Sequence, residues 1–224
     1  MWHPDMPIEY RNQIITGDCR GLLSCVPNQS CILAFADPPY WVGYDYGGGR
    51  TDRQMDYLEP GWLVTELSRV AETVCITPGI ANYSDYPKAG WVLCWYKQGS
   101  TRRSRLGGFN VWEPVLVYGR PRKRLWQDAI MLPDIVNHTT DGHFHACPKP
   151  EALLRWLIEG FSDIGDTVID PVVGSGTTCK IAKQLSRNYI AFEIDPDTAE
   201  RARQRVLNMQ LPLPLTPLES GVIE

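Results

Sequence analysis

The sequence predicts an α/β fold built on a largely parallel sheet. Short apolar runs alternate along the chain with amphipathic stretches, which is the pattern of strands joined by helices. The alternation is clearest from residue 149 onward, where helical and strand patterns follow one another directly. The chain has 224 residues, of which 43% are hydrophobic and 21% are charged, and this suits a single domain with one sizeable core.

The first half of the chain contains several strand patterns and one clear helix. Strands are expected at residues 13–16, 31–36, 73–77, 90–97 and 113–120. The run CILAFA at 31–36 is apolar throughout, which suits a strand buried on both faces. The last two strands are expected to pair as a hairpin. Between residues 61 and 72, Leu63, Leu67 and Val70 share one face of a predicted helix.

Four segments lack a regular period. Residues 43–57 are polar and rich in glycine, so they are expected to form a mobile loop. A basic linker, 98–112, joins the two hairpin strands, and residues 120–144 are expected to be irregular. The proline-containing end of the chain, 210–224, is expected to be extended or disordered.

The second half predicts helices at 149–161, 177–186 and 195–209 and strands at 166–170 and 188–194. Asp170 ends the first of these strands and is followed by a turn that contains Gly174 and Gly176. Glycines let the backbone approach a ligand, and the start of the next helix offers unpaired N–H groups. Glu193 ends the following strand, where an acid in such folds accepts hydrogen bonds from ribose hydroxyls. The pattern indicates a nucleotide-type site, although the turn alone also suits a purely structural connection.

A second motif, ADPPYW, begins where the buried strand 31–36 ends. Together with the glycine turn it resembles the amino-methyltransferases that use S-adenosylmethionine (SAM) to modify the exocyclic amine of adenine or cytosine in DNA. The segments TGDC, EPVLVYGR, HACPKP and FEIDP extend this resemblance from residue 14 to about residue 207.

The order of the motifs, with DPPY before the glycine turn, is similar to that of the permuted β-class of these enzymes. The resemblance therefore implies a Rossmann-like SAM-dependent methyltransferase fold that is circularly permuted, with a mostly parallel sheet and an antiparallel hairpin. Residues 1–211 would form a single catalytic domain with a small inserted recognition region around 98–145, and 212–224 would be a proline-rich tail.

The same resemblance implies that Asp37, Pro38, Pro39 and Tyr40 are the catalytic residues. The amine of adenine is a poor nucleophile because its lone pair is delocalised into the ring. The Asp37 carboxylate and the Pro38 carbonyl would accept both amine hydrogens and favour a pyramidal nitrogen, while the prolines keep the turn stiff. Tyr40 would offer its ring to a base that has left the duplex, and Trp41 is expected to pack in the core.

For the SAM site, the resemblance assigns the methionine end of the cofactor to the glycine turn and the ribose to Glu193. The residues of that turn are Asp170, Gly174, Ser175, Gly176 and Thr177. Asp18 would lie near the adenine of SAM. Lys149 would pair with the methionine carboxylate, or would stand in solvent as a lysine at a helix start. Val172 occupies a position where the family usually has Phe, which removes an aromatic neighbour of the cofactor.

Basic residues gather between Lys97 and Arg124, where eight lysines and arginines accompany one acid, Glu113. Such a segment steers a polyanion, or forms a solvated hairpin rich in charge. The phosphates of double-stranded DNA are expected to contact Arg102, Arg103, Arg105, Arg122, Lys123 and Arg124. The short recognition region suggests a short target site or a homodimer.

The composition also excludes some classes of protein. Seven cysteines without a CxxC pair suit reduced thiols in a cytoplasmic protein. His138, His143 and His145 lack further ligands, so no metal site is expected. No membrane association is expected, since no apolar run approaches the roughly 20 residues that span a bilayer and the first residues do not follow the pattern of a signal peptide.

Adenine N6 in DNA is the predicted target, because family members that act on cytosine N4 more often have Ser in place of Asp37. Cytosine-N4 methylation, RNA base methylation and a non-catalytic protein that binds SAM or DNA remain as alternatives. A restriction-modification enzyme and a phage enzyme both suit the chain.

Overall fold

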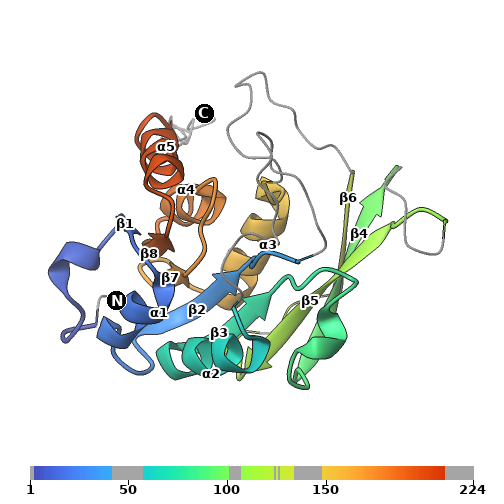
Figure 1. Ribbon diagram of the computed structural model, residues 1–224, viewed down its shortest axis with the longest axis horizontal. Helices are drawn as coiled ribbons and strands as arrows, with labels where there is room; N and C mark the ends of the chain where they lie inside the picture. The colour runs from blue at the N-terminus through green and yellow to red at the C-terminus, as the bar shows by residue number, and fades with distance from the viewer. Residues whose placement is uncertain are drawn as a thin grey trace, which may run out of the picture.

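The structure, a computed structural model, describes residues 3–41, 58–100, 107–123, 125, 127–133 and 148–209. These residues form an eight-stranded sheet in the order β1-β8-β7-β2-β3-β5-β4-β6 (Figure 1). The strands are β1 (Gln13–Thr16), β2 (Cys31–Ala36), β3 (Ala71–Ile76), β4 (Trp91–Gln98), β5 (Trp112–Gly119), β6 (Ala129–Pro133), β7 (Thr167–Asp170) and β8 (Asn188–Glu193). Strand β5 runs antiparallel to both of its neighbours, and the other paired strands run parallel.

Helices cover both faces of the sheet. They are α1 (Cys19–Leu22), α2 (Pro60–Val70), α3 (Glu151–Phe161), α4 (Thr177–Gln184) and α5 (Pro196–Leu207), with short 3-10 turns at Ile8–Tyr10, Leu23–Cys25 and Tyr83–Asp85. Helix α2 lies against one face, and α3, α4 and α5 lie against the other (Figure 1). None of these helices is both long enough and apolar enough to cross a membrane.

Strict alternation along the central strands divides the core into two layers. Leu33 and Phe35 of β2 join the layer under α3, while Ala34 and Ala36 join the layer under α2. This confirms the prediction that the strand at 31–36 is buried on both faces. Because side chains alternate with a period of two, Asp37 continues the row of Leu33 and Phe35 and lies on the α3 side.

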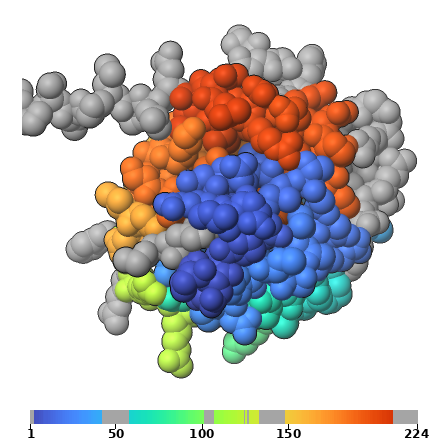
Figure 2. All heavy atoms as spheres, turned by 90° about the vertical axis from the view of Figure 1, so that its left-hand side faces the viewer, coloured from blue at the N-terminus to red at the C-terminus, as the bar shows by residue number. Residues whose placement is uncertain are grey.

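The two ends of the described chain meet. Strand β1 pairs with β8, and the Arg203 guanidinium of α5 donates to the Ile14 carbonyl at 2.8 Å and to the Thr16 hydroxyl at 2.6 Å. Figure 2 shows the corresponding blue and orange-red surfaces side by side. A strand from the start of the chain therefore completes the sheet beside elements from its end, as the permuted order predicts.

One strand was not expected from the sequence. Residues 120–144 were predicted to be irregular, but Ala129–Pro133 form β6, which pairs with β4 from Cys94↔Ala129 to Gln98↔Pro133. The run AIMLP is too short to show a period of its own, and its conformation comes from the exposed edge of β4. Pro133 is tolerated there because an edge strand leaves one row of backbone groups unpaired.

The parallel strands bring several polar residues to one edge of the sheet. Since β1, β8, β7, β2 and β3 run in the same direction, their carboxyl ends lie together. The residues at or just beyond these ends are Asp18, Glu193, Asp170, Asp37 and Thr77. The DPPY turn and the glycine turn leave the neighbouring strands β2 and β7.

Candidate active site

The Asp37 carboxylate is held from two strand ends. The Thr77 hydroxyl, just beyond β3, donates to Asp37 Oδ1 at 2.7 Å, and the Tyr40 hydroxyl donates to the same oxygen at 3.0 Å. A backbone hydrogen bond from Thr77 N to Ala36 O, 3.0 Å long, ties the two strand ends together. The Asp37 side chain is 24% exposed, so its fixed carboxylate is still reachable from outside.

Lys149, in the segment before α3, lies on this carboxylate. Its ammonium is 2.7 Å from each oxygen of Asp37 and donates to the Tyr40 hydroxyl at 2.9 Å. It also lies 5.0 Å from the centre of the Tyr40 ring. The sequence left Lys149 either paired with the methionine carboxylate of SAM or in solvent; here its ammonium lies in the DPPY cluster and its side chain is 11% exposed.

The Tyr40 hydroxyl has a second acceptor, Glu113, at the start of β5. Tyr40 Oη is 3.4 Å from Glu113 Oε2, and the other oxygen of Glu113 accepts from Lys97 Nζ at 2.7 Å. Burial raises the pKa of Tyr40 well above 10, and the charges of Asp37 and Glu113 act in the same direction. The phenol therefore keeps its proton and acts as a donor at neutral pH.

The buried pair of Lys97 and Glu113 was missed from the sequence. Lys97 was counted with the basic segment, but it is 2% exposed and faces inward. The alternation along β4 could have predicted the burial of Lys97, because Leu93, Trp95 and Lys97 are the buried residues of one face. A lysine on the apolar face of a strand needs a buried partner.

The backbone of the DPPY turn is fixed by residues beyond β3. The Asn82 side-chain amide donates to the Tyr40 carbonyl. Gly79 has φ +72°, and a Cβ there would lie 2.8 Å from Tyr40 Cδ2. Pro38 is buried and Pro39 half-buried in the turn itself. The close approach to the ring therefore requires a glycine at position 79, which the sequence analysis did not single out.

Trp41 differs from the expectation that it packs in the core. It is 39% exposed and adopts φ 54°, at the outer end of the turn. Trp41 is the last residue of the described segment 3–41, and its indole lies partly at the surface.

Asp170 organises the glycine turn. One of its oxygens accepts from Val172 N at 3.1 Å, and the other accepts from the Thr178 hydroxyl at 2.6 Å. The side chain is buried, which raises its pKa to about 7, and the nearby charges of Asp37 and Glu193 add to the increase. The contribution of these two charges reflects how close the three carboxylates lie.

Glu193 and Asp18 stand at the ends of β8 and β1. The carboxylate of Glu193 accepts from Gly174 N and Asp195 N, each at 3.0 Å, and burial raises its pKa. Asp18 caps α1 by accepting from Arg20 N at 2.9 Å. Its side chain is 39% exposed, and the hydrogen bond from the Arg20 guanidinium lowers its pKa. Both acids are oriented toward the same edge of the sheet.

Ser175, Gly176 and Thr177 pack the glycine turn against helix α5. The hydroxyls of Ser175 and Thr177 are buried and lie 2.9 Å apart, and Arg205 donates to the Ser175 carbonyl and to Thr177 Oγ1. Gly176 has φ +78°, and a Cβ there would lie 3.1 Å from that of Ala202. In this structure these three residues shape the turn through protein contacts.

Two residues predicted to bind DNA lie away from this site. Arg122 pairs with Glu72, and Lys123 pairs with Asp163. Both follow the end of β5, which lies at the edge where β3 begins. The other basic residues assigned to DNA are outside the described residues: Arg102, Arg103, Arg105 and Arg124.

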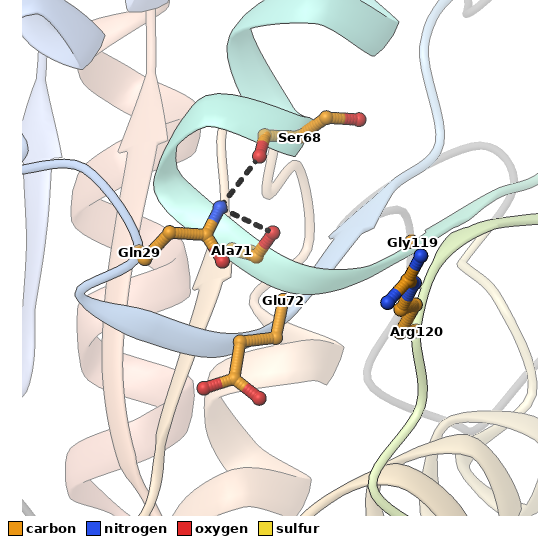
Figure 3. A pocket seen from close by; sticks show the side chains of 6 residues that line it. All are labelled: Gln29, Ser68, Ala71, Glu72, Gly119 and Arg120. Carbon is orange, nitrogen blue, oxygen red and sulfur yellow. Dashed lines mark hydrogen bonds between the residues drawn. The ribbon is translucent and has the colours of Figure 1, made fainter.

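A hollow at this opposite edge is also remote from Asp37, Asp170 and Glu193 (Figure 3). Its lining residues are Gln29, Ser68, Ala71, Glu72, Gly119 and Arg120. The Gln29 amide donates to the carbonyls of Ser68 and Ala71, so its polar groups serve the connection between α2 and β3. Among the described residues, no group of three His, Cys, Asp or Glu could hold a metal ion, and His138, His143 and His145 lie outside them. The described cysteines are free thiols, and most are buried.

The pKa of Asp170 makes a prediction for stability. In the unfolded chain this carboxyl has its ordinary value of 3.8, whereas burial raises the folded value to about 7. The folded protein therefore holds this proton more tightly, and the resulting stabilisation is complete below pH 3.8 and lost as pH rises through about 7. An asparagine does not titrate. The free energy of unfolding of the wild type should fall relative to that of Asp170→Asn across this range, by on the order of a few kcal/mol. Urea unfolding at several pH values measures it, and two parallel curves would contradict the assignment.

Known proteins resemble this chain over most of its length. A family model for N6/N4 methyltransferases, described as DNA methylase, matches residues 92–204. The Escherichia coli (strain K12) protein YubD is 28% identical over 214 residues, which cover 89% of this chain and 92% of that protein. The type II methyltransferase M.HinfI of Haemophilus influenzae is 25% identical over 248 residues, covering 88% of this chain and 69% of that protein.

Solved structures share the fold. The M1.HpyAVI–SAM complex matches with a TM-score of 0.59 at 19% identity, over 86% of this chain and 98% of that chain. The PvuII DNA methyltransferase, described as cytosine-N4-specific, matches with a TM-score of 0.59 at 15% identity, over 86% of this chain and 85% of that one. These likenesses confirm the predicted methyltransferase fold. With the family model matching half of its residues, the chain belongs to the N6/N4 DNA methylase family.

Proposed function

We propose that this protein transfers the methyl group of SAM to the N6 amine of an adenine that has left a DNA duplex. The observation that carries the proposal is the Asp37 carboxylate, fixed by Thr77, Tyr40 and Lys149 beside the glycine turn. Membership of the N6/N4 DNA methylase family supports a DNA methyltransferase that acts on either adenine N6 or cytosine N4. The choice of adenine rests on the acid at position 37.

Cytosine N4 is the second candidate. The PvuII enzyme, described as cytosine-N4-specific, has the same fold, so the fold is compatible with cytosine N4 as the target. A carboxylate accepts a hydrogen from either amine, so the chemistry at Asp37 suits both bases.

The residues present suit SAM. Glu193 and Asp18 are carboxylates at the ends of neighbouring strands, and an acid at such a strand end suits a ribose diol. Gly176 is the N-cap residue of helix α4 and offers no side-chain cap, so the glycine turn and the first helical turn suit the methionine carboxylate through backbone N–H groups. When bound, SAM supplies a methyl group on a positively charged sulfur.

The chain's own residues would position the base. Asp37 and the Pro38 carbonyl accept the two amine hydrogens, so the nitrogen lone pair turns toward the methyl group. The nitrogen would gain the methyl group as the bond from that methyl to the sulfur of SAM breaks, and it would lose one proton, which the Asp37 carboxylate would accept. Tyr40 supplies a ring for the base to stack on. Because these groups are held before the base arrives, positioning supplies most of the rate.

DNA contacts are proposed for the basic linker between β4 and β5. Strand β4 ends and β5 begins at the edge where Asp37 lies, so the linker starts and finishes beside the site. Arg102, Arg103 and Arg105 lie in it. Arg122 and Lys123 are left out of the proposed set because they have acidic partners at the opposite edge.

The domain organisation stays as proposed from the sequence. Residues 1–211 form one catalytic domain, 98–145 supply recognition, and 212–224 are a tail. The strand β6 lies within this recognition region.

Methyl transfer to DNA tests the function directly. The wild type should incorporate labelled methyl from SAM into duplex DNA, and digestion to nucleosides should yield N6-methyladenine by mass. The isosteric Asp37→Asn should lose at least about 100-fold in rate, because it replaces one acceptor oxygen with an NH2 donor and removes the negative charge that faces the amine. Asp5→Asn, at an exposed position, is the matched control. A product of N4-methylcytosine would replace the adenine assignment, and a wild type that binds DNA but transfers no methyl would support a binding protein.

Gly79 should be needed for activity rather than for stability alone. Alanine at Gly79 or at Gly165, which has φ +84°, is strained to a similar extent and should cost about 1–2 kcal/mol of unfolding free energy. At Gly165 a Cβ meets no atom within 4 Å, whereas at Gly79 it displaces the Tyr40 ring. Only Gly79→Ala should therefore slow methyl transfer, by about 100-fold. Equal activity of the two folded variants would refute the role of this contact.

The linker arginines should account for part of the salt dependence of DNA binding. Replacing Arg102, Arg103 and Arg105 together with Ala should reduce the slope of log affinity against log salt by about 0.9 for each phosphate that these arginines neutralise. Arg122→Ala, at the opposite edge, should leave the slope unchanged. Fluorescence anisotropy with a short duplex measures both, and the reverse result would move the DNA-binding surface to the other edge.

A further inference from the structure

We propose that Glu113, held by Lys97, takes the Tyr40 hydrogen bond when the target base arrives and so frees an acceptor position on Asp37. This inference rests on the proposed function, because it concerns how Asp37 becomes available to the amine. Glu113 acts through Tyr40 and is a positioning residue.

Asp37 already accepts hydrogen bonds from three side chains. A carboxylate oxygen has two lone-pair positions. Asp37 Oδ1 accepts from the Thr77 hydroxyl at 2.7 Å and from the Tyr40 hydroxyl at 3.0 Å, while Oδ2 accepts from Lys149 at 2.7 Å. Oδ1, which Lys149 Nζ also approaches at 2.7 Å, therefore has no position left for an amine hydrogen, whereas Oδ2 keeps one. Release of one Oδ1 donor would let the amine bind either oxygen of the carboxylate.

Tyr40 and Thr77 each have a second acceptor, but that of Thr77 is the Ala36 carbonyl, which already accepts from Thr77 N, whereas that of Tyr40 is a carboxylate. A phenol has one proton, and Tyr40 Oη lies 3.0 Å from Asp37 Oδ1 and 3.4 Å from Glu113 Oε2. Rotation of the hydroxyl hydrogen transfers the hydrogen bond from Asp37 to Glu113 without moving the ring. Burial keeps the phenol protonated, since the pKa of Tyr40 lies well above 10.

Lys97 makes Glu113 suitable for this role. The lysine is 2% exposed and donates to Glu113 Oε1 at 2.7 Å, so Oε2 faces Tyr40 as a pure acceptor. Desolvating two charges offsets much of their attraction, so such a pair adds little to stability over an apolar pair of similar size. Its place behind Tyr40 gives it a role that an apolar pair could not perform.

The isosteric variant Glu113→Gln tests the idea. Lys97 should bind the amide oxygen and turn the amide NH2 toward Tyr40, which leaves the phenol with Asp37 as its sole acceptor. The rate of methyl transfer should fall about tenfold or more, while SAM affinity stays within about twofold. Glu66→Gln, in the pair of Glu66 and Arg69 on α2, should leave both unchanged.

A double-mutant cycle separates positioning from general damage. Tyr40→Phe removes the hydroxyl, so Glu113→Gln should cost less than about twofold in that background. A cost equal to that in the wild type would overturn the proposal, and so would an unimpaired Glu113→Gln. The double variant with Lys97→Met and Glu113→Leu should stay folded but transfer methyl groups slowly. Full activity of this apolar variant would also overturn the proposed role of Glu113.

A readout independent of activity separates this proposal from the proposed function. In protein labelled with 13C at tyrosine Cζ, the NMR signal of Tyr40 is the one absent from Tyr40→Phe. Glu113→Gln should shift it, and Glu66→Gln should not. If the wild type transfers no methyl group, the proposed function fails, and this signal alone decides whether Glu113 contacts the phenol. An unmoved signal overturns the inference.

Discussion

The Asp37 carboxylate is the interaction on which the rest of the site depends. Donors reach it from the end of β3, from its own turn and from the segment before α3, and the sheet keeps these segments together. A buried or half-buried carboxylate is costly unless it is hydrogen-bonded, so these donors both stabilise it and fix its direction. The same contacts prepare an acceptor for an amine, which joins the stability of the turn to its proposed chemistry.

The surroundings of Tyr40 extend this network across the sheet. Asp37, Thr77 and Glu113 follow from strands β2, β3 and β5, and their side chains point to the face that α3 covers. The antiparallel direction of β5 matters here, because it brings the first residues of that strand to the edge where β2 and β3 end. A parallel strand in this place would have put Glu113 at the opposite edge.

Much of this arrangement could be predicted from the sequence. Apolar runs and glycine turns located most strands, and the two motifs placed Asp37 and Asp170 at strand ends. Sequence reasoning failed where a contact depends on tertiary structure. Strand β6 exists because β4 offers an edge, Gly79 matters because the Tyr40 ring lies against it, and Lys97 is buried because Glu113 meets it. The residues near each of these positions in the sequence do not reveal its tertiary partner, although the alternation along β4 indicated that Lys97 is buried.

The position of the extruded base relative to the Asp37 carboxylate decides whether Asp37 binds the target amine. A crystal structure of the protein with the demethylated form of SAM and a duplex that it methylates would show it. The exocyclic nitrogen is expected to lie about 3 Å from an oxygen of the Asp37 carboxylate, with the Tyr40 ring in place. A base whose amine meets no carboxylate, or a duplex bound at the edge of Arg122, would contradict it.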